Sequence, residues 1–404
     1  MLDARTIEVI KSTVPVLEVH GQTITKTFYQ TMFKNHPELL NVFNHANQRQ
    51  GKQPTALANA VYAATTHIDR LEEILPVVRG IAQKHRALGI LPEHYPIVGE
   101  NLLAAIKTVL GDAATEEILD AWGKAYGVIA DVFISVEAEM YREAEEKKGG
   151  WRGFRRFVVD RKVKESDVIT SFYLKPEDGQ AIASYAPGQY ITVRVKPEGQ
   201  EFTHLRHYSL STAPGQPYYR ISVKREDAAK DRPAGVVSTY LHARIGEGDV
   251  LELSAPAGDF TLDQSQNLPL VLLSGGVGLT PMVSMLETEL QNGAKREIVY
   301  VHAARSAKHH AMREHIAELA RKHDNLRAYT VYETPETGES SDKTGYIDLP
   351  WLKSVAAAGS DFYFCGPVPF MKAVRRALKD WGVPDERIHF EFFGPADSLE
   401  DTIS

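Results

Sequence analysis

The stretch that decides the fold is Ser274-Gly275-Gly276-Val277-Gly278-Leu279-Thr280-Pro281, which directly follows the apolar run Leu270-Val271-Leu272-Leu273. The apolar run predicts a buried strand, and the end of the stretch predicts a helix with Thr280 as N-cap and Pro281 as first residue. Such a turn exposes backbone N–H groups at the positive end of a helix, where a pyrophosphate can bind. Its glycine spacing departs from the Gly-x-Gly-x-x-Gly fingerprint, and a tight strand-to-helix turn without a ligand is the alternative.

Two further apolar runs of strand length, Ile298-Val299-Tyr300-Val301 and Phe362-Tyr363-Phe364, lie downstream of this turn. They alternate with stretches of helical periodicity near residues 281–292, 308–322 and 369–381. This alternation predicts an α/β domain with an open parallel sheet covered by helices. Cys365-Gly366-Pro367 ends the last of these strands, at the carboxyl edge where ligands of open parallel sheets bind.

Upstream of the turn, residues 154–260 contain short apolar runs with strand periodicity. The clearest are Tyr190-Ile191-Thr192-Val193-Arg194-Val195, Tyr219-Arg220-Ile221-Ser222-Val223 and Val250-Leu251-Glu252-Leu253. Turn signals such as Pro187-Gly188 and Gly246-Glu247-Gly248-Asp249 separate them. This pattern predicts an antiparallel barrel or sandwich.

The first 146 residues show helical periodicity instead, as where Val128, Val132, Val136 and Met140 fall four apart. The run Glu145-Glu146-Lys147-Lys148-Gly149-Gly150 is charged and then flexible, as expected of a hinge between domains. The sequence therefore predicts three domains, an all-α domain at residues 1–147, an antiparallel β domain at 152–263 and an α/β domain at 266–404.

Composition excludes several classes of function. The 404 residues carry 46 basic and 53 acidic side chains, a net charge of −7, which gives no electrostatic reason to bind nucleic acid or anionic lipid. Cys365 is the single cysteine, so we expect no internal disulfide and a reducing cytoplasm. Asp3 and the lack of an apolar segment before Lys11 argue against a secretory signal. Glycines and prolines interrupt the longest uncharged stretch, residues 268–286, so no stable membrane association is expected.

Arg206-His207-Tyr208-Ser209 places a guanidinium, an aromatic ring and a hydroxyl at the end of a predicted strand. Arginine can pair with a phosphate and an aromatic side chain can cover a flat ring, although an exposed strand with a salt-bridged arginine would look the same. The order of Arg-x-Tyr-Ser, Gly-Gly-x-Gly-x-Thr-Pro, Cys-Gly-Pro and the terminal Glu391-Phe392-Phe393-Gly394-Pro395 resembles the ferredoxin-reductase family of flavin and nicotinamide enzymes.

This resemblance implies an antiparallel barrel that binds FAD, followed by a sheet domain that binds NAD(P)H. The residues implied at FAD are Tyr190, Arg206, His207, Tyr208, Ser209, Gly235 and Ser238, with Phe392, Phe393, Gly394 and Pro395 closing over the flavin. The residues implied at the nicotinamide nucleotide are Gly276, Val277, Gly278, Leu279, Thr280, Pro281 and Cys365. Cys365 is then a positioning residue rather than a nucleophile. NADH is favoured as donor, with NADPH left open because Arg305 follows the second strand, where a 2′-phosphate could be met.

In the helical domain, His85 shares a face with Ile81 and Leu88, which suits either a ligand of a metal or an ordinary core histidine. Glu137 shares a face with Phe133, and a carboxylate on an apolar face needs a partner, such as the second nitrogen of a ligating histidine. The alternative is an exposed residue near a helix end. Tyr95 follows a proline-bracketed turn and either completes this network or simply packs.

The arrangement of Tyr29, Phe43, Gln53, Leu57, His85, Tyr95 and Glu137 resembles the globin domain of flavohaemoglobins, and the resemblance covers essentially the whole chain. It implies haem b with His85 as proximal iron ligand, Phe43 and Leu57 at the haem and Tyr29 and Gln53 over bound oxygen. Tyr95 and Glu137 would orient His85, and Lys84 and Glu391 would lie where the cofactor domains meet. Tyr29, Gln53, Tyr95 and Glu137 are therefore the expected catalytic residues.

The reaction so implied is nitric oxide dioxygenation: NAD(P)H reduces FAD, FAD reduces haem iron, and dioxygen at the iron converts nitric oxide to nitrate. An alkylhydroperoxide or general flavin reductase is the alternative enzyme, and a gas sensor or oxygen carrier is the non-enzymatic alternative. Expected partners are dioxygen, nitric oxide and NAD(P)H, with lipid as a further candidate occupant of the distal pocket. The protein is expected to be a monomer.

Overall fold

The computed structural model of the chain describes residues 2–43, 52–230 and 232–393. Two compact units are distinguished among the described residues: one contains those up to Phe154 together with Arg194–Arg206, and the other contains Arg155–Val193 and the residues from His207 to Phe393. Among the described residues, no helix combines the length and apolar character that crossing a membrane requires.

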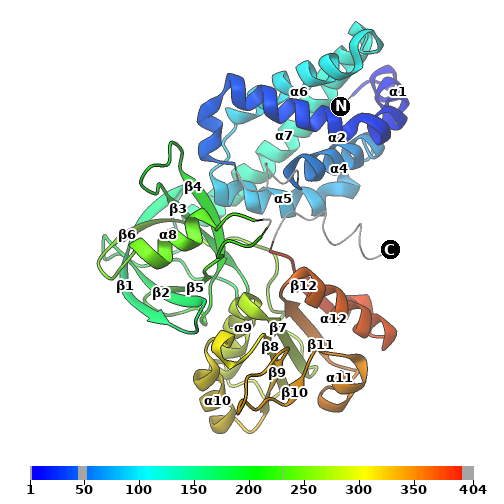
Figure 1. Cartoon of the computed structure of the whole chain (residues 1–404). Coiled ribbons are helices and arrows are strands. Elements are labelled where there is room, and N and C mark those ends of the chain that lie inside the picture. The colour runs from blue at the N-terminus through cyan, green and yellow to red at the C-terminus, as the bar shows by residue number, and fades with distance from the viewer. Residues whose placement is uncertain (1, 44–51, 231, 394–404) are drawn as a thin grey trace. The chain divides into compact units, whose positions relative to one another are not determined.

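The first unit is helical (Figure 1). Its helices are α1 (Ala4–Ser12), α2 (Val14–Asn35), α4 (Lys52–Thr66), α5 (Leu75–Leu88), α6 (His94–Leu110) and α7 (Glu116–Glu146), with short 3-10 turns η1 (Pro37–Asn41), η2 (Leu71–Ile74) and η3 (Gly111–Ala113). Side chains of Asp3 and Thr115 cap the first and last helices by accepting backbone N–H groups. Apolar side chains including Ile24, Phe28 and Trp122 form one core between the helices. The predicted all-α domain is confirmed.

A six-stranded antiparallel barrel follows in the chain, and most of it belongs to the second unit. Its strands are β1 (Phe154–Lys164), β2 (Ile169–Pro176), β3 (Tyr190–Val195), β4 (His204–Ser209), β5 (Tyr219–Lys224) and β6 (Val250–Ser254), in the order β4-β3-β6-β1-β2-β5. Helix α8 (Val236–Arg244) lies between β5 and β6 in the chain. The prediction of an antiparallel β domain is confirmed, and the barrel is the correct choice over the sandwich.

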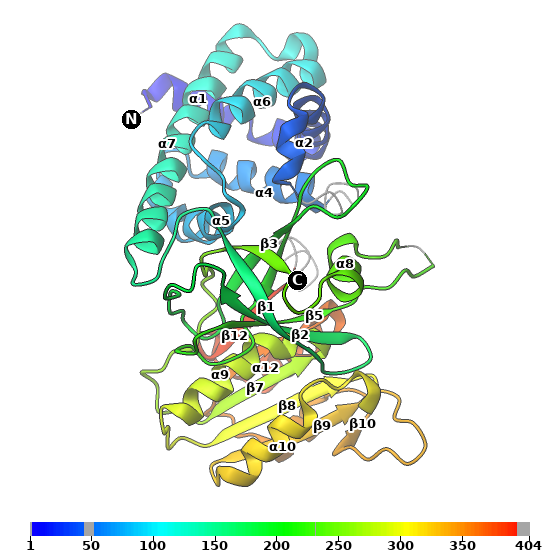
Figure 2. The same ribbon diagram turned by 90° about the vertical axis from the view of Figure 1, so that its left-hand side faces the viewer.

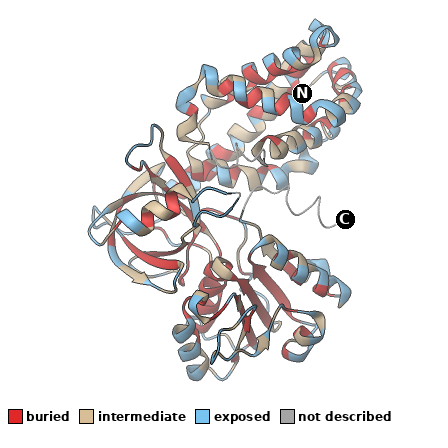
Figure 3. Cartoon of the chain, viewed as in Figure 1, coloured by how far each residue is buried: buried red, intermediate tan, exposed pale blue. Residues whose placement is uncertain are grey.

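A six-stranded parallel sheet follows, in the order β10-β9-β8-β7-β11-β12. Its strands are β7 (Leu270–Gly275), β8 (Ile298–Ala304), β9 (Leu326–Tyr332), β10 (Lys343–Thr344), β11 (Asp361–Cys365) and β12 (Ile388–Glu391). Helices α9 (Leu279–Gln291) and α10 (Arg313–Lys322) pack on one face, which is turned to the viewer in Figure 2. Helices α11 (Leu349–Val355) and α12 (Val368–Asp380) pack on the other. Figure 3 shows the result, a buried sheet between helices with exposed outer faces, as the sequence predicts.

The start of α9 differs from the prediction. Gly276–Gly278 forms a 3-10 turn that runs directly into the helix, so the helix begins at Leu279 and Gly278 takes the N-cap position. Thr280 is therefore inside the first turn, where its hydroxyl donates to the carbonyl of Val277 at 3.0 Å, and Pro281 is the third helical residue. The predicted N-cap at Thr280 is wrong because the glycines themselves provide the tight turn.

Candidate functional site

Three helices of the first unit bring His85, Tyr95 and Glu137 together. Glu137 Oε1 lies 2.7 Å from His85 Nδ1 and accepts the Tyr95 hydroxyl at 2.6 Å. An ionised carboxylate only accepts hydrogen bonds, so the proton of the imidazole is on Nδ1. The other ring nitrogen of His85, Nε2, then carries the free lone pair that a metal ligand requires.

A second tyrosine, Tyr126, also holds Tyr95 in place. The Tyr126 hydroxyl donates to the backbone carbonyl of Tyr95 at 2.6 Å, and its ring lies where a side chain at Gly99 would be. Burial is the main cause that raises the pKa of the Tyr95 hydroxyl, and the hydrogen bond to Glu137 raises it further. The hydroxyl therefore stays protonated and donates. A glycine inside α6 was the available signal, since glycine disfavours a helix interior.

Tyr29 and Phe43 belong to an aromatic group in the same unit. The Tyr29 ring is 4.8 Å from Phe28, 5.8 Å from Phe33 and 5.8 Å from Phe43, and only 7% of Tyr29 is exposed. Leu57 packs partly buried against the same core cluster. The side chains of this group are aromatic or aliphatic, and the Tyr29 hydroxyl is the polar group among them.

Gln53 lies in the first turn of α4, with Pro54 after it. Its side-chain oxygen Oε1 is buried and has no hydrogen-bond partner among the described residues. A buried amide oxygen without a partner costs free energy, and such groups in folded proteins commonly meet a ligand or ordered water. This orphaned oxygen is an independent sign of a bound polar group in the helical unit.

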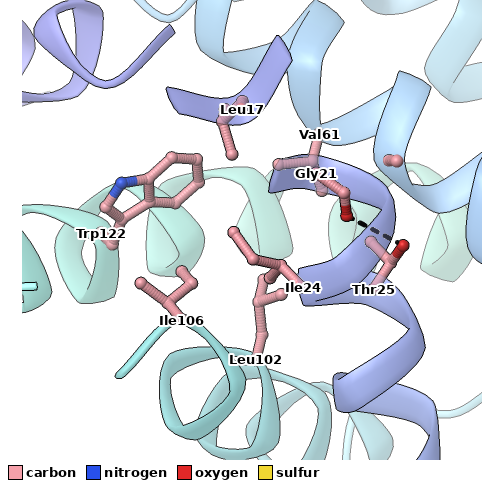
Figure 4. Close-up of a pocket in the computed structure, with 9 residues that line it drawn as sticks. Leu17, Gly21, Ile24, Thr25, Val61, Leu102, Ile106 and Trp122 are labelled. Atoms are coloured by element: carbon pink, nitrogen blue, oxygen red, sulfur yellow. Dashed lines mark hydrogen bonds between the residues drawn. The ribbon is translucent and has the colours of Figure 1, made fainter. Parts of the chain in front are cut away.

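A small cavity lies elsewhere in the helical unit (Figure 4). It measures about 10 Å³, close to the least space that holds a water molecule. The lining is almost wholly apolar, and its one hydroxyl, on Thr25, donates to the Gly21 carbonyl at 3.0 Å. The full lining is Leu17, Gly21, Ile24, Thr25, Ala58, Val61, Leu102, Ile106 and Trp122. This cavity is a packing gap rather than a polar site.

Replacing Gly21 by alanine is expected to stabilise the helical unit by about 0.5–1 kcal/mol, because glycine in a helix interior is less favourable than alanine. The added Cβ would lie 3.7 Å from Ala58 Cβ, an ordinary contact at the edge of the cavity. Denaturant unfolding of the holoprotein measures the change. A lower midpoint would show that the cavity cannot accept the methyl group.

In the barrel, β4 carries Arg206, His207, Tyr208 and Ser209 on consecutive residues. His207 is hydrogen-bonded to Thr192 (2.8 Å between Nδ1 and Oγ1), and its ring lies 4.7 Å from that of the buried Tyr190. The structure thus brings Tyr190 and His207 together, while Arg206 and Tyr208 are half-buried and Ser209 is buried.

Helix α8 has an open N-terminus, because its N-cap Gly235 makes no side-chain cap. The Ser238 hydroxyl is engaged with backbone instead, accepting from Glu226 N at 3.1 Å and donating to Gly235 O at 3.3 Å. At the other end, Lys162 Nζ donates to the carbonyls of His242 (2.8 Å) and Ile245 (2.6 Å). The Lys162 ammonium stabilises the negative C-terminal end of α8. The backbone N–H groups at the positive N-terminal end suit an anion. Lys162 lies on β1, about 80 residues away in sequence, so its place beside α8 could not be predicted from the sequence.

At the carboxyl edge of the parallel sheet, Cys365 pairs in register with Ser274 on one side and Glu391 on the other. Burial is the main cause that raises the pKa of the Cys365 thiol well above its ordinary value, and the charge of Glu391 raises it further. The thiol is therefore protonated and is a poor nucleophile.

The glycine turn lies against this edge. A side chain at Gly278 would overlap the carbonyl of Cys365, so the two loops touch backbone to backbone. Gly276 has φ of 54°, which favours glycine on conformational grounds. Among the remaining residues of the turn, Val277 is half-buried, whereas Leu279, Thr280 and Pro281 are buried.

The remaining predicted residues are dispersed. Phe392 packs partly buried against the sheet core, whereas Phe393 is 45% exposed. Lys84 is exposed on α5. Gly394 and Pro395 lie outside the described residues.

Together these features define a class: a histidine–carboxylate pair in a globin-like helical domain, joined to a flavin and nicotinamide reductase module. Three family matches agree, Globin at residues 26–133, the oxidoreductase FAD-binding domain at 156–262 and the oxidoreductase NAD-binding domain at 272–376. The chain is 57% identical over 403 residues to a flavohemoprotein of Halalkalibacterium halodurans, covering 98% of each, and 50% identical over 399 residues to flavohemoprotein A of Dictyostelium discoideum, again covering 98% of each. The chain belongs to the flavohemoprotein family.

Solved structures give the same result. Flavohemoglobin from Malassezia yamatoensis, with bound FAD and heme, matches with a TM-score of 0.84 at 26% identity over 97% of this chain and all of that one. The FAD/NAD-binding domain of nitric oxide dioxygenase from Vibrio cholerae matches with a TM-score of 0.55 at 42% identity, covering 60% of this chain and 99% of that one.

Proposed function

We propose that this protein is an NAD(P)H-dependent nitric oxide dioxygenase with haem b and FAD as prosthetic groups. The observation that carries the proposal is the Glu137 carboxylate bonded to Nδ1 of His85, within a chain that also holds a flavin barrel and a nucleotide-binding sheet. A strongly polarised histidine favours oxygen activation over reversible oxygen carriage. The matched Vibrio cholerae domain comes from a protein named for this activity.

The residues present fit the haem. The donor set offers one imidazole nitrogen, Nε2 of His85, with its partner nitrogen already bonded, and the orphaned Gln53 oxygen offers a polar contact. We propose His85 as iron ligand, Tyr29 and Gln53 as polar contacts to the diatomic substrate, and Phe43 and Leu57 as apolar walls that exclude water. Lys84 and Glu391 are proposed to influence electron transfer between the cofactors.

The residues also fit FAD and the nicotinamide nucleotide. The uncapped N-terminus of α8 at Gly235 suits a pyrophosphate, with Arg206 as counter-charge and Ser238 fixing the turn. Tyr190, His207, Tyr208 and Ser209 are proposed to line the flavin, and the segment from Phe392 to Pro395 to cover it. Backbone contact at Gly278 supports nucleotide binding by Gly276, Val277, Gly278, Leu279, Thr280 and Pro281, next to Cys365.

Acidic side chains support NADH rather than NADPH as the donor. In the loop after β8, Ala307 N donates to the Glu339 carboxylate at 3.1 Å, and Lys308 pairs with Glu336 at 2.7 Å. A 2′-phosphate bound at this strand end would meet these carboxylates, and the repulsion disfavours it.

When bound, FAD accepts hydride from NAD(P)H and the haem iron performs one-electron chemistry with dioxygen and nitric oxide. The protein supplies the rest. Glu137 keeps the proton on His85 Nδ1 and so fixes which nitrogen is free, while Tyr95 donates to the same carboxylate oxygen and fixes its position. Cys365 stays a neutral thiol in the nucleotide site and donates no electrons.

We further propose that the functional domains are residues 1–147, 152–263 and 266–404, which contain the three family matches. A monomer in the cytoplasm is proposed with them, and the buried free Cys365 supports a reducing compartment. Lipid stays a candidate occupant of the distal pocket.

The test is NADH oxidation by the holoprotein in air, with and without nitric oxide. Nitric oxide should accelerate oxidation and be converted to nitrate, two molecules for each NADH, because each needs one electron and one dioxygen. Tyr29→Phe keeps the ring contacts and removes the hydroxyl, and should slow the nitric oxide reaction by about a hundredfold. If nitric oxide leaves the rate unchanged, or Tyr29→Phe consumes nitric oxide as fast as the wild type, the proposal is wrong.

A further inference from the structure

The carboxylate of Glu287, on α9, is buried where the nucleotide-binding part of the second unit meets the barrel. It is 7% exposed and accepts four hydrogen bonds. The donors are Thr212 Oγ1 (2.7 Å), Ala213 N (2.9 Å), Arg220 Nη2 (3.1 Å) and His315 Nε2 (2.8 Å). The first three belong to the barrel and the fourth to α10. No part of the proposed chemistry uses this residue.

The barrel segment that Glu287 holds is fixed by further contacts. The Thr212 carbonyl accepts Ser284 Oγ of α9 at 2.7 Å and the Tyr185 hydroxyl at 2.6 Å. Arg220 also donates to the Ser211 carbonyl. Two side chains of α9, Ser284 and Glu287, thus form hydrogen bonds with one short segment of the barrel, Thr212 and Ala213.

The residues on each side of this contact are close in sequence to the two proposed cofactor sites. Thr212 lies three residues after Ser209, the last residue of β4, which carries the proposed flavin residues. Helix α9 begins at Leu279, immediately after the glycine turn. The hydrogen bonds of Glu287 and Ser284 to Thr212 and Ala213 therefore connect the helix that follows the nucleotide turn to the segment that follows the flavin strand.

Separating the barrel from α9 at this contact would cost free energy, because the buried carboxylate is charged. Burial alone would raise the pKa of Glu287, but the hydrogen bond from His315, the charge of Arg220 and the other donors outweigh it and lower the pKa to about 2. The carboxylate is ionised, and moving the barrel away would leave it buried without its donors. Apolar side chains also join the two parts, since Ile169 of β2 belongs to the same core cluster as Met282 and Leu286 of α9. A cleft of about 450 Å³, lined in part by Gln216, Tyr218 and Gln291, opens beside the Glu287 cluster.

Resting on the proposed function, we infer that Glu287 is a positioning residue for hydride transfer, which fixes the nicotinamide-binding turn at reacting distance from the flavin-binding strand. Hydride transfer needs its two carbons in a narrow range of distance and angle, so a small rotation of one part against the other slows the step without weakening nucleotide binding as much.

The experiment measures flavin reduction by NADH in the holoprotein under anaerobic conditions, by stopped-flow absorbance. Glu287→Gln keeps size and removes the charge, and Ser284→Ala is a milder variant that removes one hydrogen bond from the same contact. Glu289→Gln is the matched control: Glu289 is also a buried glutamate on α9, but it pairs with Arg296 (2.7 Å) inside the nucleotide-binding part.

Glu287→Gln should lower the limiting rate of flavin reduction by about ten- to a hundredfold, and Ser284→Ala should lower it less. The NADH concentration at half-saturation should change little, and the long-wavelength charge-transfer band between flavin and nicotinamide should weaken. Glu289→Gln should leave all three readouts unchanged. Equal rates and bands in Glu287→Gln and wild type, or equal losses in the Glu289 control, overturn the inference alone. Wild-type flavin that NADH does not reduce overturns both the inference and the proposed function.

Discussion

Replacing Glu137 by glutamine is expected to slow nitric oxide turnover by about ten- to a hundredfold and to shift the absorption spectrum of the ferrous protein. The amide keeps the shape of the carboxylate and can still accept from His85 and Tyr95, which now bond to Oε1 at 2.7 and 2.6 Å. What is lost is the negative charge, and charge-assisted hydrogen bonds are roughly twice as strong as neutral ones. A less polarised imidazole donates less electron density through Nε2.

Glu139→Gln is the control, because Glu139 lies on the same helix but is about half exposed and pairs with Arg79 at a long distance, 3.9 Å. It should change neither spectrum nor rate. The absorption bands of the ferrous protein and the iron–histidine stretching frequency measure the effect on His85 directly, and steady-state nitric oxide consumption measures its consequence. Unaltered bands in Glu137→Gln would mean that the carboxylate only fills space beside His85.

The sequence was sufficient for those parts of the fold whose signals are local. Helical periodicity predicts α7, and an apolar run before a glycine turn predicts β7 and α9. Strands β2 and β9 were not predicted: β2 is buried along most of its length and so lacks alternation, and Arg327 interrupts the apolar character of β9. Their identity as strands depends on neighbours that are distant in sequence.

The same distinction applies to the sites. Glu137 on an apolar helix face signalled a missing partner, but its distance from His85, which is 52 residues away in sequence, required the fold. Glu287 gave no such signal, because a glutamate on a helix usually faces solvent. Its partners Thr212, Arg220 and His315 are separated from it by 75, 67 and 28 residues, so only the structure reveals the cluster.

The second large effect is expected at the glycine turn, where Gly278→Ala should lower NADH-dependent flavin reduction by about a hundredfold or more. The new methyl group would overlap the backbone carbonyl of Cys365 and crowd the nitrogen of Gly366, and backbone atoms cannot move aside as a flexible side chain can. The two loops at the carboxyl edge would have to separate, which displaces the start of α9 and the backbone N–H groups proposed to bind the pyrophosphate.

Gly359→Ala separates this effect from the general effect of adding a methyl group to the domain, since a side chain at 359 meets nothing within 4 Å among the described residues. Both variants should keep wild-type flavin and haem absorption, and dithionite should still reduce the flavin of each. Only Gly278→Ala should then fail with NADH. A near-wild-type rate in that variant would show that the backbone contact between Gly278 and Cys365 is not needed to hold the nucleotide, and that the turn serves the packing of the sheet alone.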